Sequence, residues 1–233
     1  MHQVRKIVKS ILPGPILSRL EREYAKETHI NRSLSRFTGK TTYLEIGVRY
    51  GHCIGQIKAH TKIAIDPAPQ NLDNPAWSGI ELHQQTSDEY FREITPDKLE
   101  SNPINVALVD GLHEFRQTLR DVLNLERLMS PRGVIYIHDC NPPTRGHAEG
   151  LERDWNGDVW KVAYYLRHFR PDLKYFTLDC DWGLGVVSGF TRNPPSPNER
   201  EIERTAALDY DLLARNRNKI LNLKSPLLFS ARL

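Results

Sequence analysis

The stretch Tyr43-Leu44-Glu45-Ile46-Gly47-Val48-Arg49-Tyr50-Gly51 decides the fold of this 233-residue chain. An apolar run leads into a turn in which two glycines stand four residues apart, and glycines let the backbone approach a ligand closely. A second apolar run, Ile63-Ala64-Ile65, follows and ends in Asp66. A strand, a glycine turn, a helix and a second strand that ends in a carboxylate form a nucleotide-binding unit.

The residues of the turn restrict which nucleotide can bind. Glu45 lies two residues before Gly47, and the turn lacks the middle glycine of the dinucleotide fingerprint G-x-G-x-x-G. A dinucleotide needs backbone amides on its pyrophosphate, and the Glu45 carboxylate would oppose that anion. Asp66 can accept hydrogen bonds from both hydroxyls of a ribose. We therefore expect a cofactor with adenosine, a positive charge and no phosphate, and S-adenosylmethionine is such a molecule.

Strands and helices alternate from residue 41 onward, which predicts an α/β fold. The Asp181-Trp182-Gly183 turn predicts that the last two strands form an antiparallel hairpin. Thr86-Ser87-Asp88-Glu89 predicts a capping box at a helix start. We expect a Rossmann-like, seven-stranded, mostly parallel sheet with an antiparallel terminal hairpin and helices on both faces. The predicted strands are 43–47, 63–66, 82–85, 105–110, 134–139, 173–178 and 184–190.

The chain divides into three predicted parts: a helical cap (1–38), an S-adenosylmethionine-binding catalytic domain (39–192), and a linker with a helical tail (193–233). The cap begins with a short basic amphipathic helix that could rest on an anionic membrane or pack on the domain. Residues 141–158, rich in proline, glycine and charge, are a predicted lid over the site. A single polar helix at about 199–223 could form a homodimer or pack back on its own domain.

The composition points to an ordinary soluble protein. Hydrophobic residues make up 39% of the chain and charged residues 26%, and the net charge of +3 is too small to suggest nucleic acid. Three cysteines without framework spacing predict a reducing, cytoplasmic setting. No apolar run approaches the roughly 20 residues that span a bilayer. We expect no transmembrane segment.

Two further motifs support a family resemblance: Val109-Asp110-Gly111-Leu112-His113 and Ile137-His138-Asp139-Cys140-Asn141-Pro142. With the Glu45 turn and the late hairpin, residues 41–192 resemble the class I S-adenosylmethionine-dependent methyltransferases. The two motifs resemble a bacterial branch of small-molecule and glycan O-methyltransferases. The resemblance implies methyl transfer to a hydroxyl of a sugar, a polysaccharide precursor or a related small molecule.

The resemblance also implies which residues bind the cofactor. The implied cofactor-binding residues are Glu45, Gly47, Gly51, Asp66, Ser87, Asp88 and Asp110. The glycine turn with its glutamate would line the methionine end, Asp66 would hold the ribose, and Ser87 with Asp88 would lie near the adenine. Serine and aspartate are also preferred at the start of a helix in the absence of any ligand. Ser87 and Asp88 could therefore cap a helix instead of binding the cofactor.

The predicted chemistry lies at the ends of the fourth and fifth strands. Asp110 and Asp139 end these strands, so both carboxylates emerge at the same edge of the sheet. With His138 or Asn141 they could bind Mg²⁺, which would hold the acceptor hydroxyl and lower its pKa. His113 is the candidate general base, because its ordinary pKa suits proton transfer at neutral pH. Asp110 and Asp139 could instead cap backbone, and both histidines could be structural.

Other functions remain as alternatives. Asn141-Pro142-Pro143-Thr144 resembles the Asn-Pro-Pro-aromatic motif of methyltransferases that flip adenine, but it follows the wrong strand and lacks the aromatic residue. We therefore expect no nucleic-acid partner. A metal-independent O- or N-methyltransferase, or an inactive cofactor-binding scaffold, is the remaining alternative. Arg145, Lys161 and Arg167 would suit an anionic or nucleotide-linked acceptor, or would form a solvated face.

Overall fold

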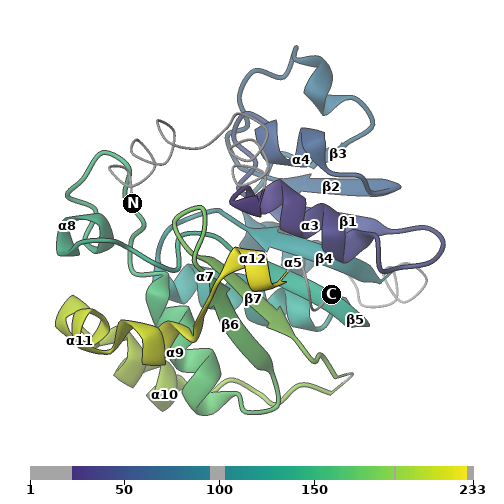
Figure 1. The fold of residues 1–233 in the computed structure, drawn as a ribbon. Helices are drawn as coiled ribbons and strands as arrows, with labels where there is room; N and C mark the ends of the chain where they lie inside the picture. The colour runs from purple at the N-terminus through teal and green to yellow at the C-terminus, as the bar shows by residue number, and fades with distance from the viewer. Residues whose placement is uncertain (1–22, 95–102, 192, 230–233) are drawn as a thin grey trace.

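The computed structural model describes residues 23–94, 103–191 and 193–229. Its centre is a sheet in the order β3-β2-β1-β4-β5-β7-β6-β8 (Figure 1). Strand β7 runs antiparallel to both of its neighbours, and the other pairs are parallel. The strands are β1 (Thr42–Ile46), β2 (Thr61–Ile65), β3 (Glu81–His83), β4 (Ile104–Val109), β5 (Met129–Ile137), β6 (Lys174–Leu178), β7 (Leu184–Ser188) and β8 (Leu223–Lys224).

The predicted α/β fold and the terminal hairpin are confirmed, but the predicted strand count was wrong. Within the described residues the sheet has eight strands rather than seven, because β8 from the C-terminal tail pairs with β6. A two-residue strand after a helix carries no alternation of its own, so sequence patterning could not find it. The fifth strand, predicted at 134–139, begins earlier than expected: β5 starts at Met129, and its pairing with β4 shifts register.

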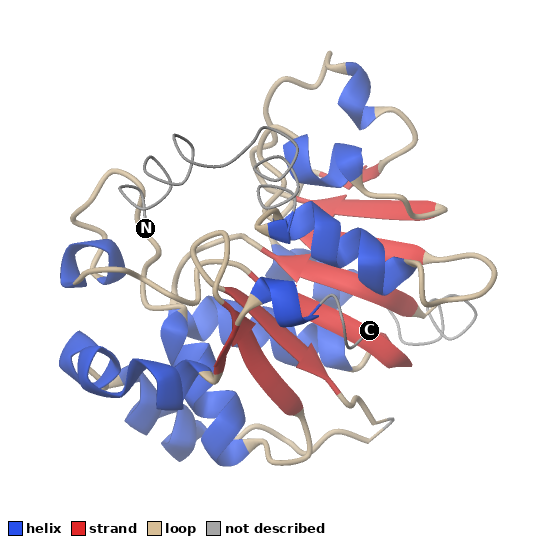
Figure 2. Cartoon of the chain, in the orientation of Figure 1, coloured by secondary structure: helices blue, strands red, loops and turns tan. Residues whose placement is uncertain are grey.

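Helices cover both faces of the sheet (Figure 2). Successive strand residues point to opposite faces, so Tyr43 packs on the side of α3 and α4, whereas Leu44 packs on the side of α5, α7, α9 and α11. The α-helices are α3 (Lys26–Leu34), α4 (His52–Gln56), α5 (Ser87–Glu93), α7 (Phe115–Glu126), α8 (Arg145–Ala148), α9 (Trp160–Phe169), α10 (Glu199–Ala206), α11 (Tyr210–Leu221) and α12 (Pro226–Phe229), and η1 (Pro75–Trp77) is a 3₁₀ turn.

The order of the strands determines where a ligand can bind. The chain runs outward from β1 to β2 and β3 and then returns to β4 on the other side of β1. The loops after β1 and β4 therefore diverge, and in open parallel sheets ligands bind at such a switch point, beyond the carboxyl ends of the strands. Gly47 follows β1 and Asp110 follows β4, so both stand at this point.

Capping residues determine where two of the helices begin. The predicted capping box is confirmed: the Thr86 hydroxyl accepts a hydrogen bond from the Glu89 amide (3.2 Å), and the Glu89 carboxylate accepts one from the Thr86 amide (2.8 Å). The single tail helix predicted at 199–223 is wrong, because Asp209 caps a new helix, α11, by accepting from the Leu212 amide (3.1 Å).

The tail packs on its own domain. Leu213, Ile220 and Leu221 of α11 are fully or almost fully buried in the core that contains α9. The apolar residues that suggested a dimer interface are therefore largely used within the chain. The basic amphipathic helix predicted near the N-terminus lies outside the described residues. Among the described helices, none is long and apolar enough to cross a membrane.

Candidate active site

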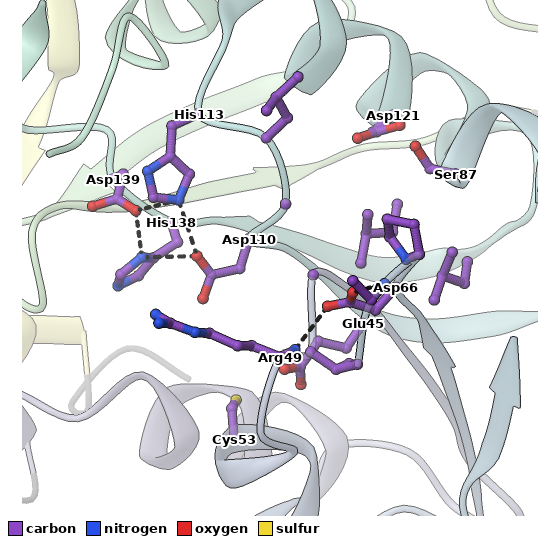
Figure 3. A pocket seen from close by; sticks show the side chains of 18 of the residues that line it. Glu45, Arg49, Cys53, Asp66, Ser87, Asp110, His113, Asp121, His138 and Asp139 are labelled. Atoms are coloured by element: carbon purple, nitrogen blue, oxygen red, sulfur yellow. Dashed lines mark hydrogen bonds and ion pairs between the residues drawn. The ribbon is translucent and has the colours of Figure 1, made fainter. Parts of the chain in front are cut away.

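A cavity of about 1000 Å³ opens at the carboxyl edge of β1, β2 and β4 (Figure 3). Most of the predicted site residues line it, and these are Glu45, Gly47, Asp66, Ser87, Asp88, Asp110, His113, His138 and Asp139. Two predicted residues do not line it. Gly51 starts α4 with a φ of +71° and lies against the Trp77 side chain, so its role is to begin the helix. The second is Asn141.

The glycine turn is held tightly against the neighbouring strands. The Gly47 amide donates to the Ile65 carbonyl (2.9 Å), and the Asp110 amide donates to the Ile46 carbonyl (2.9 Å). Gly47 has a φ of +83°, a left-handed conformation that glycine adopts at little cost. The chain after β1 and the chain after β4 therefore run in contact beside the cavity.

Glu45 is a buried carboxylate at the edge of this cavity. It is 2% exposed, and the Tyr43 hydroxyl donates a hydrogen bond to its Oε2 (2.7 Å). Burial raises the pKa of Glu45 to about 7, the Tyr43 hydrogen bond opposes that rise, and Asp110 and Lys26 act in opposite directions. Glu45 is thus close to half-ionised at neutral pH in the free protein.

The affinity for S-adenosylmethionine should therefore depend on pH. A cationic cofactor binds best when Glu45 is ionised, so below a pKa of about 7 binding must first remove a proton. Affinity should rise about tenfold from pH 6 to pH 8, and Glu45→Gln should flatten this rise. Calorimetric titration at these pH values checks this expectation. An equal slope in wild type and Glu45→Gln would contradict it.

Asp66 connects the glycine turn to the end of β2. Its Oδ2 accepts from the Arg49 amide and its Oδ1 from the Ala68 amide, each at 2.8 Å. Arg49, at a φ of +45°, is thereby held in a conformation that is unusual for a residue with a side chain. Each carboxylate oxygen keeps a second lone pair, so Asp66 can still accept from ribose hydroxyls.

Ser87 and Asp88 belong to a polar cluster at the other end of the cavity. Gln117 of α7 donates to Ser87 (3.2 Å), Asp88 (3.3 Å) and Asp121 (3.1 Å). Sequence reasoning missed Asp121, which is buried and lines the cavity. Burial raises the pKa of Asp121 to about 6, although bonds from Ser87 and Gln117 oppose the rise. The helical spacing of α7 gave no sign that Asp121 would face a ligand.

Two carboxylates and two histidines meet beside this cavity (Figure 3). His113 Nε2 lies 3.2 Å from Asp139 Oδ2 and 3.8 Å from Asp110 Oδ1. His138 Nδ1 faces the same two oxygens, at 2.8 Å and 3.1 Å. The structure thus brings together four side chains that the sequence predicted separately.

Other residues hold the remaining polar atoms of this cluster. Lys26 of α3 donates to Asp110 Oδ2 (2.8 Å), and Asn156 of the predicted lid donates to Asp139 Oδ1 (2.7 Å). The Trp155 carbonyl lies 3.0 Å from His113 Nδ1, so a neutral His113 keeps its proton on Nδ1 and leaves Nε2 unprotonated. Sequence reasoning missed these three contacts.

The charges of the cluster stabilise one another. Burial alone would raise the pKa of Asp110, but His138, His113 and Lys26 hold that pKa well below its ordinary value. Burial opposes protonation of His138, yet the two carboxylates raise its pKa well above the ordinary value. The pKa of His113 is raised in the same way, against burial, by Asp110 and Asp139.

The cluster contains a group that could hold a metal ion. Among the described residues, Asp110, His113 and Asp139 each offer one ligand atom, and these atoms lie within 4.8 Å of one another. His138 is less suited to be a ligand, because its Nδ1 is already paired with both carboxylates and its Nε2 is buried without a hydrogen bond, 3.5 Å from Asp181.

The structure does not bring Asn141 to this group. Its amide nitrogen donates to Asp179 (3.2 Å), and its oxygen accepts from Arg217 of α11. Asn141 is therefore used to connect the loop after β5 to the C-terminal tail. Its position just after Asp139 and Cys140, beyond the end of β5, suggested a ligand, but Arg217 lies 76 residues away in sequence, so the contact left no local signal.

The fold and the site agree with comparisons to known proteins. Residues 44–140 match the family model of a methyltransferase domain. The matched segment begins at the glycine turn and ends one residue after Asp139, so it contains the cavity residues of β1, β2, β4 and β5. This segment is therefore similar to methyltransferase domains, as the glycine turn and the strand-end carboxylates predicted. None of the curated proteins compared with this chain matches it.

Solved structures of methyltransferases have a similar fold to this chain. The methyltransferase PaMTH1 of Podospora anserina, solved with S-adenosylhomocysteine, is 13% identical with a TM-score of 0.53, and the match covers 80% of this chain and 86% of that one. An O-methyltransferase from Bacillus cereus, also in complex with S-adenosylhomocysteine, is 14% identical with a TM-score of 0.50, and the match covers 79% and 86% of the two chains. Identities this low establish the fold alone.

Proposed function

We propose that this chain is a methyltransferase that transfers the methyl group of S-adenosylmethionine to a hydroxyl oxygen of a sugar, a polysaccharide precursor or a related small molecule. The observation that supports this most is the cluster of Asp110, His113 and Asp139 beside the cofactor cavity. A hydroxyl is a weak nucleophile until it loses its proton, so an O-methyltransferase needs a base and positive charge beside the acceptor.

The residues of the cluster can supply both requirements. Neutral His113 would take the hydroxyl proton at Nε2, because the Trp155 carbonyl keeps the other ring nitrogen protonated (3.0 Å), and the carboxylates that raise the pKa of His113 would stabilise the imidazolium that forms. Asn156 and Lys26 fix the two carboxylates, so the acceptor meets a preorganised site. The main contribution of the protein would be the alignment of the acceptor oxygen with the sulfonium methyl.

The donor set fits a divalent cation. The second polar atom of each candidate ligand is held by a neighbouring residue, which is how metal ligands are usually oriented. A cation bound by Asp110 and Asp139 would lower the pKa of the acceptor hydroxyl. We propose Mg²⁺ with His113 free as the base. If His113 were a third ligand, its imidazole would favour a first-row transition ion over Mg²⁺.

One observation favours a metal-independent alternative. Lys26 lies 2.8 Å from Asp110, and His138 lies 2.8 Å from Asp139, so the two carboxylates already have cationic partners. In that case the protein's own cations would hold the cluster in place, and a bound metal would add nothing. The three cysteines are buried thiols, which suits action in a reducing compartment such as the cytoplasm.

The test is the transfer of label from methyl-tritiated S-adenosylmethionine into a fractionated cell extract. We expect label in a glycan or small-molecule fraction, its loss in excess EDTA, and its return with added Mg²⁺. Restoration by Zn²⁺ but not by Mg²⁺ would support His113 as a ligand. Label that persists in EDTA would support the metal-independent alternative. Label in nucleic acid would contradict the proposed acceptor.

A further inference from the structure

We propose that the acceptor binds in a second cavity, between the predicted lid (141–158) and the C-terminal helices, and that this cavity takes an uncharged, hydroxyl-rich ring. This inference rests on the proposed O-methyl transfer. The cavity measures about 490 Å³. His113 and Trp155 line both this cavity and the cofactor cavity, so the two meet at the proposed base.

The C-terminal tail fixes the walls of this second cavity. Tyr210 of α11 donates to the Pro143 carbonyl (3.0 Å), and Arg217 donates to the Pro142 carbonyl (2.8 Å). Arg145 of α8 forms an ion pair with Asp211 (2.6 Å). Figure 1 places α8 beside α11 in agreement with these contacts. The tail therefore fastens the predicted lid in place, and its residues 208–210 complete the cavity.

The walls combine aromatic surface with hydrogen-bond acceptors. Trp155 is 39% exposed, with its ring 5.1 Å from the His113 ring, and Tyr210 stands on the facing tail. Such rings can cover the apolar face of a sugar. The carboxylates of Glu114 and Asp209 also line the cavity and can accept hydrogen bonds from hydroxyl groups. This is the combination that an uncharged polyol needs.

The basic residues near this cavity are already engaged. Lys161 is the one lysine or arginine among the described residues that line it, and its ammonium binds Asp158 (3.0 Å) and the Ala206 carbonyl (2.8 Å). Arg145 is paired with Glu149 and Asp211, and Arg167 donates to the Ile220 carbonyl.

These three residues are the ones that would have suited an anionic acceptor. Among the described residues that line the cavity, an anionic group would face several carboxylates and no lysine or arginine that is not already engaged, and burying an unpaired charge is costly. The cavity is therefore expected to bind an uncharged sugar ring in preference to a phosphate or a uronic acid.

The test is saturation-transfer NMR on the full chain with S-adenosylhomocysteine bound. The probes are the methyl glycosides of glucose, galactose, mannose and rhamnose, with methyl glucuronide as the anionic counterpart. We expect transfer to at least one neutral glycoside and none to the glucuronide. Binding of no neutral glycoside, or equal binding of the glucuronide, would overturn the proposal. Calorimetry of S-adenosylhomocysteine on the same sample tests the methyltransferase site separately.

Variants locate the binding site. Tyr210→Ala should weaken binding of the neutral glycoside about fivefold, because an aromatic contact is lost. Tyr210→Phe keeps the ring and should lose less. Tyr164→Ala removes a tyrosine of α9 that lines neither cavity and should leave binding unchanged. If label reaches a glycan but Tyr210→Ala leaves glycoside binding and acceptor KM unchanged, the function stands and this location is wrong.

Discussion

Gly47→Ala is expected to abolish cofactor binding and to lower the melting temperature by about 10 °C or more. Gly47 has a φ of +83°, so alanine would already cost about 1 kcal/mol in backbone strain. The larger effect is steric. An added Cβ would overlap the Asp110 carbonyl oxygen and stand 2.5 Å from the Gly111 Cα. Both are backbone atoms, so no flexible side chain can give way.

The displaced backbone explains why binding and stability should fail together. To accept a Cβ, the chain after β1 must move away from the chain after β4. That movement would break the bond from the Asp110 amide to the Ile46 carbonyl (2.9 Å) and shift the carboxylate that faces both histidines. The same backbone displacement would therefore distort both the cofactor cavity and the cluster of Asp110, His113, His138 and Asp139.

Gly79→Ala is the matched control. Gly79 also has a positive φ, of +71°, but an added Cβ there would have no atom within 4 Å. Gly79→Ala should lower the melting temperature only by the cost of the backbone strain, and it should still bind the cofactor. Thermal unfolding and calorimetric titration with S-adenosylhomocysteine measure both effects. If Gly47→Ala is as stable as Gly79→Ala and still binds S-adenosylhomocysteine, the close approach of these two chains is not needed for the site.

The features that the sequence predicted are those with a local pattern. The apolar runs that end in Asp66, Asp110 and Asp139 are each continuous in sequence, and parallel strands deliver their carboxyl ends to one edge. The capping box at Thr86 likewise needs only four consecutive residues. For this reason the sheet, the glycine turn and the main side chains of the cavity could be predicted without a structure.

The features that were missed depend on contacts between distant segments. Lys26 lies 84 residues from Asp110, and Asn156 lies 17 residues from Asp139 across the predicted lid. An isolated lysine on a helix or an asparagine in a loop is typical of solvated surface, so neither could be distinguished by type. Asn141 was predicted as a metal ligand from its position alone. In the structure its side-chain oxygen instead accepts a hydrogen bond from Arg217 of the tail.

Asp139→Asn is expected to reduce methyl transfer about 10²- to 10³-fold, with affinity for S-adenosylhomocysteine nearly unchanged. Asp139 has a φ of +62°, and asparagine is among the few residues that adopt this conformation readily. The substitution is also nearly isosteric, and the amide oxygen can still accept from Asn156 (2.7 Å in the wild type). The backbone should therefore stay in place while the charge is lost.

The loss of that charge should act on the chemical step. Asp139 Oδ2 faces His138 at 2.8 Å and His113 at 3.2 Å, so both imidazoles lose a carboxylate and a bound cation would lose a ligand. Asp179→Asn is the charge-matched control, since Asp179 bonds Asn141 outside the cluster. The measurement is the initial rate of label transfer into the fraction that the wild type labels. Equal rates for the two variants would remove Asp139 from the mechanism, whereas a collapse of S-adenosylhomocysteine affinity in Asp139→Asn would make its role structural.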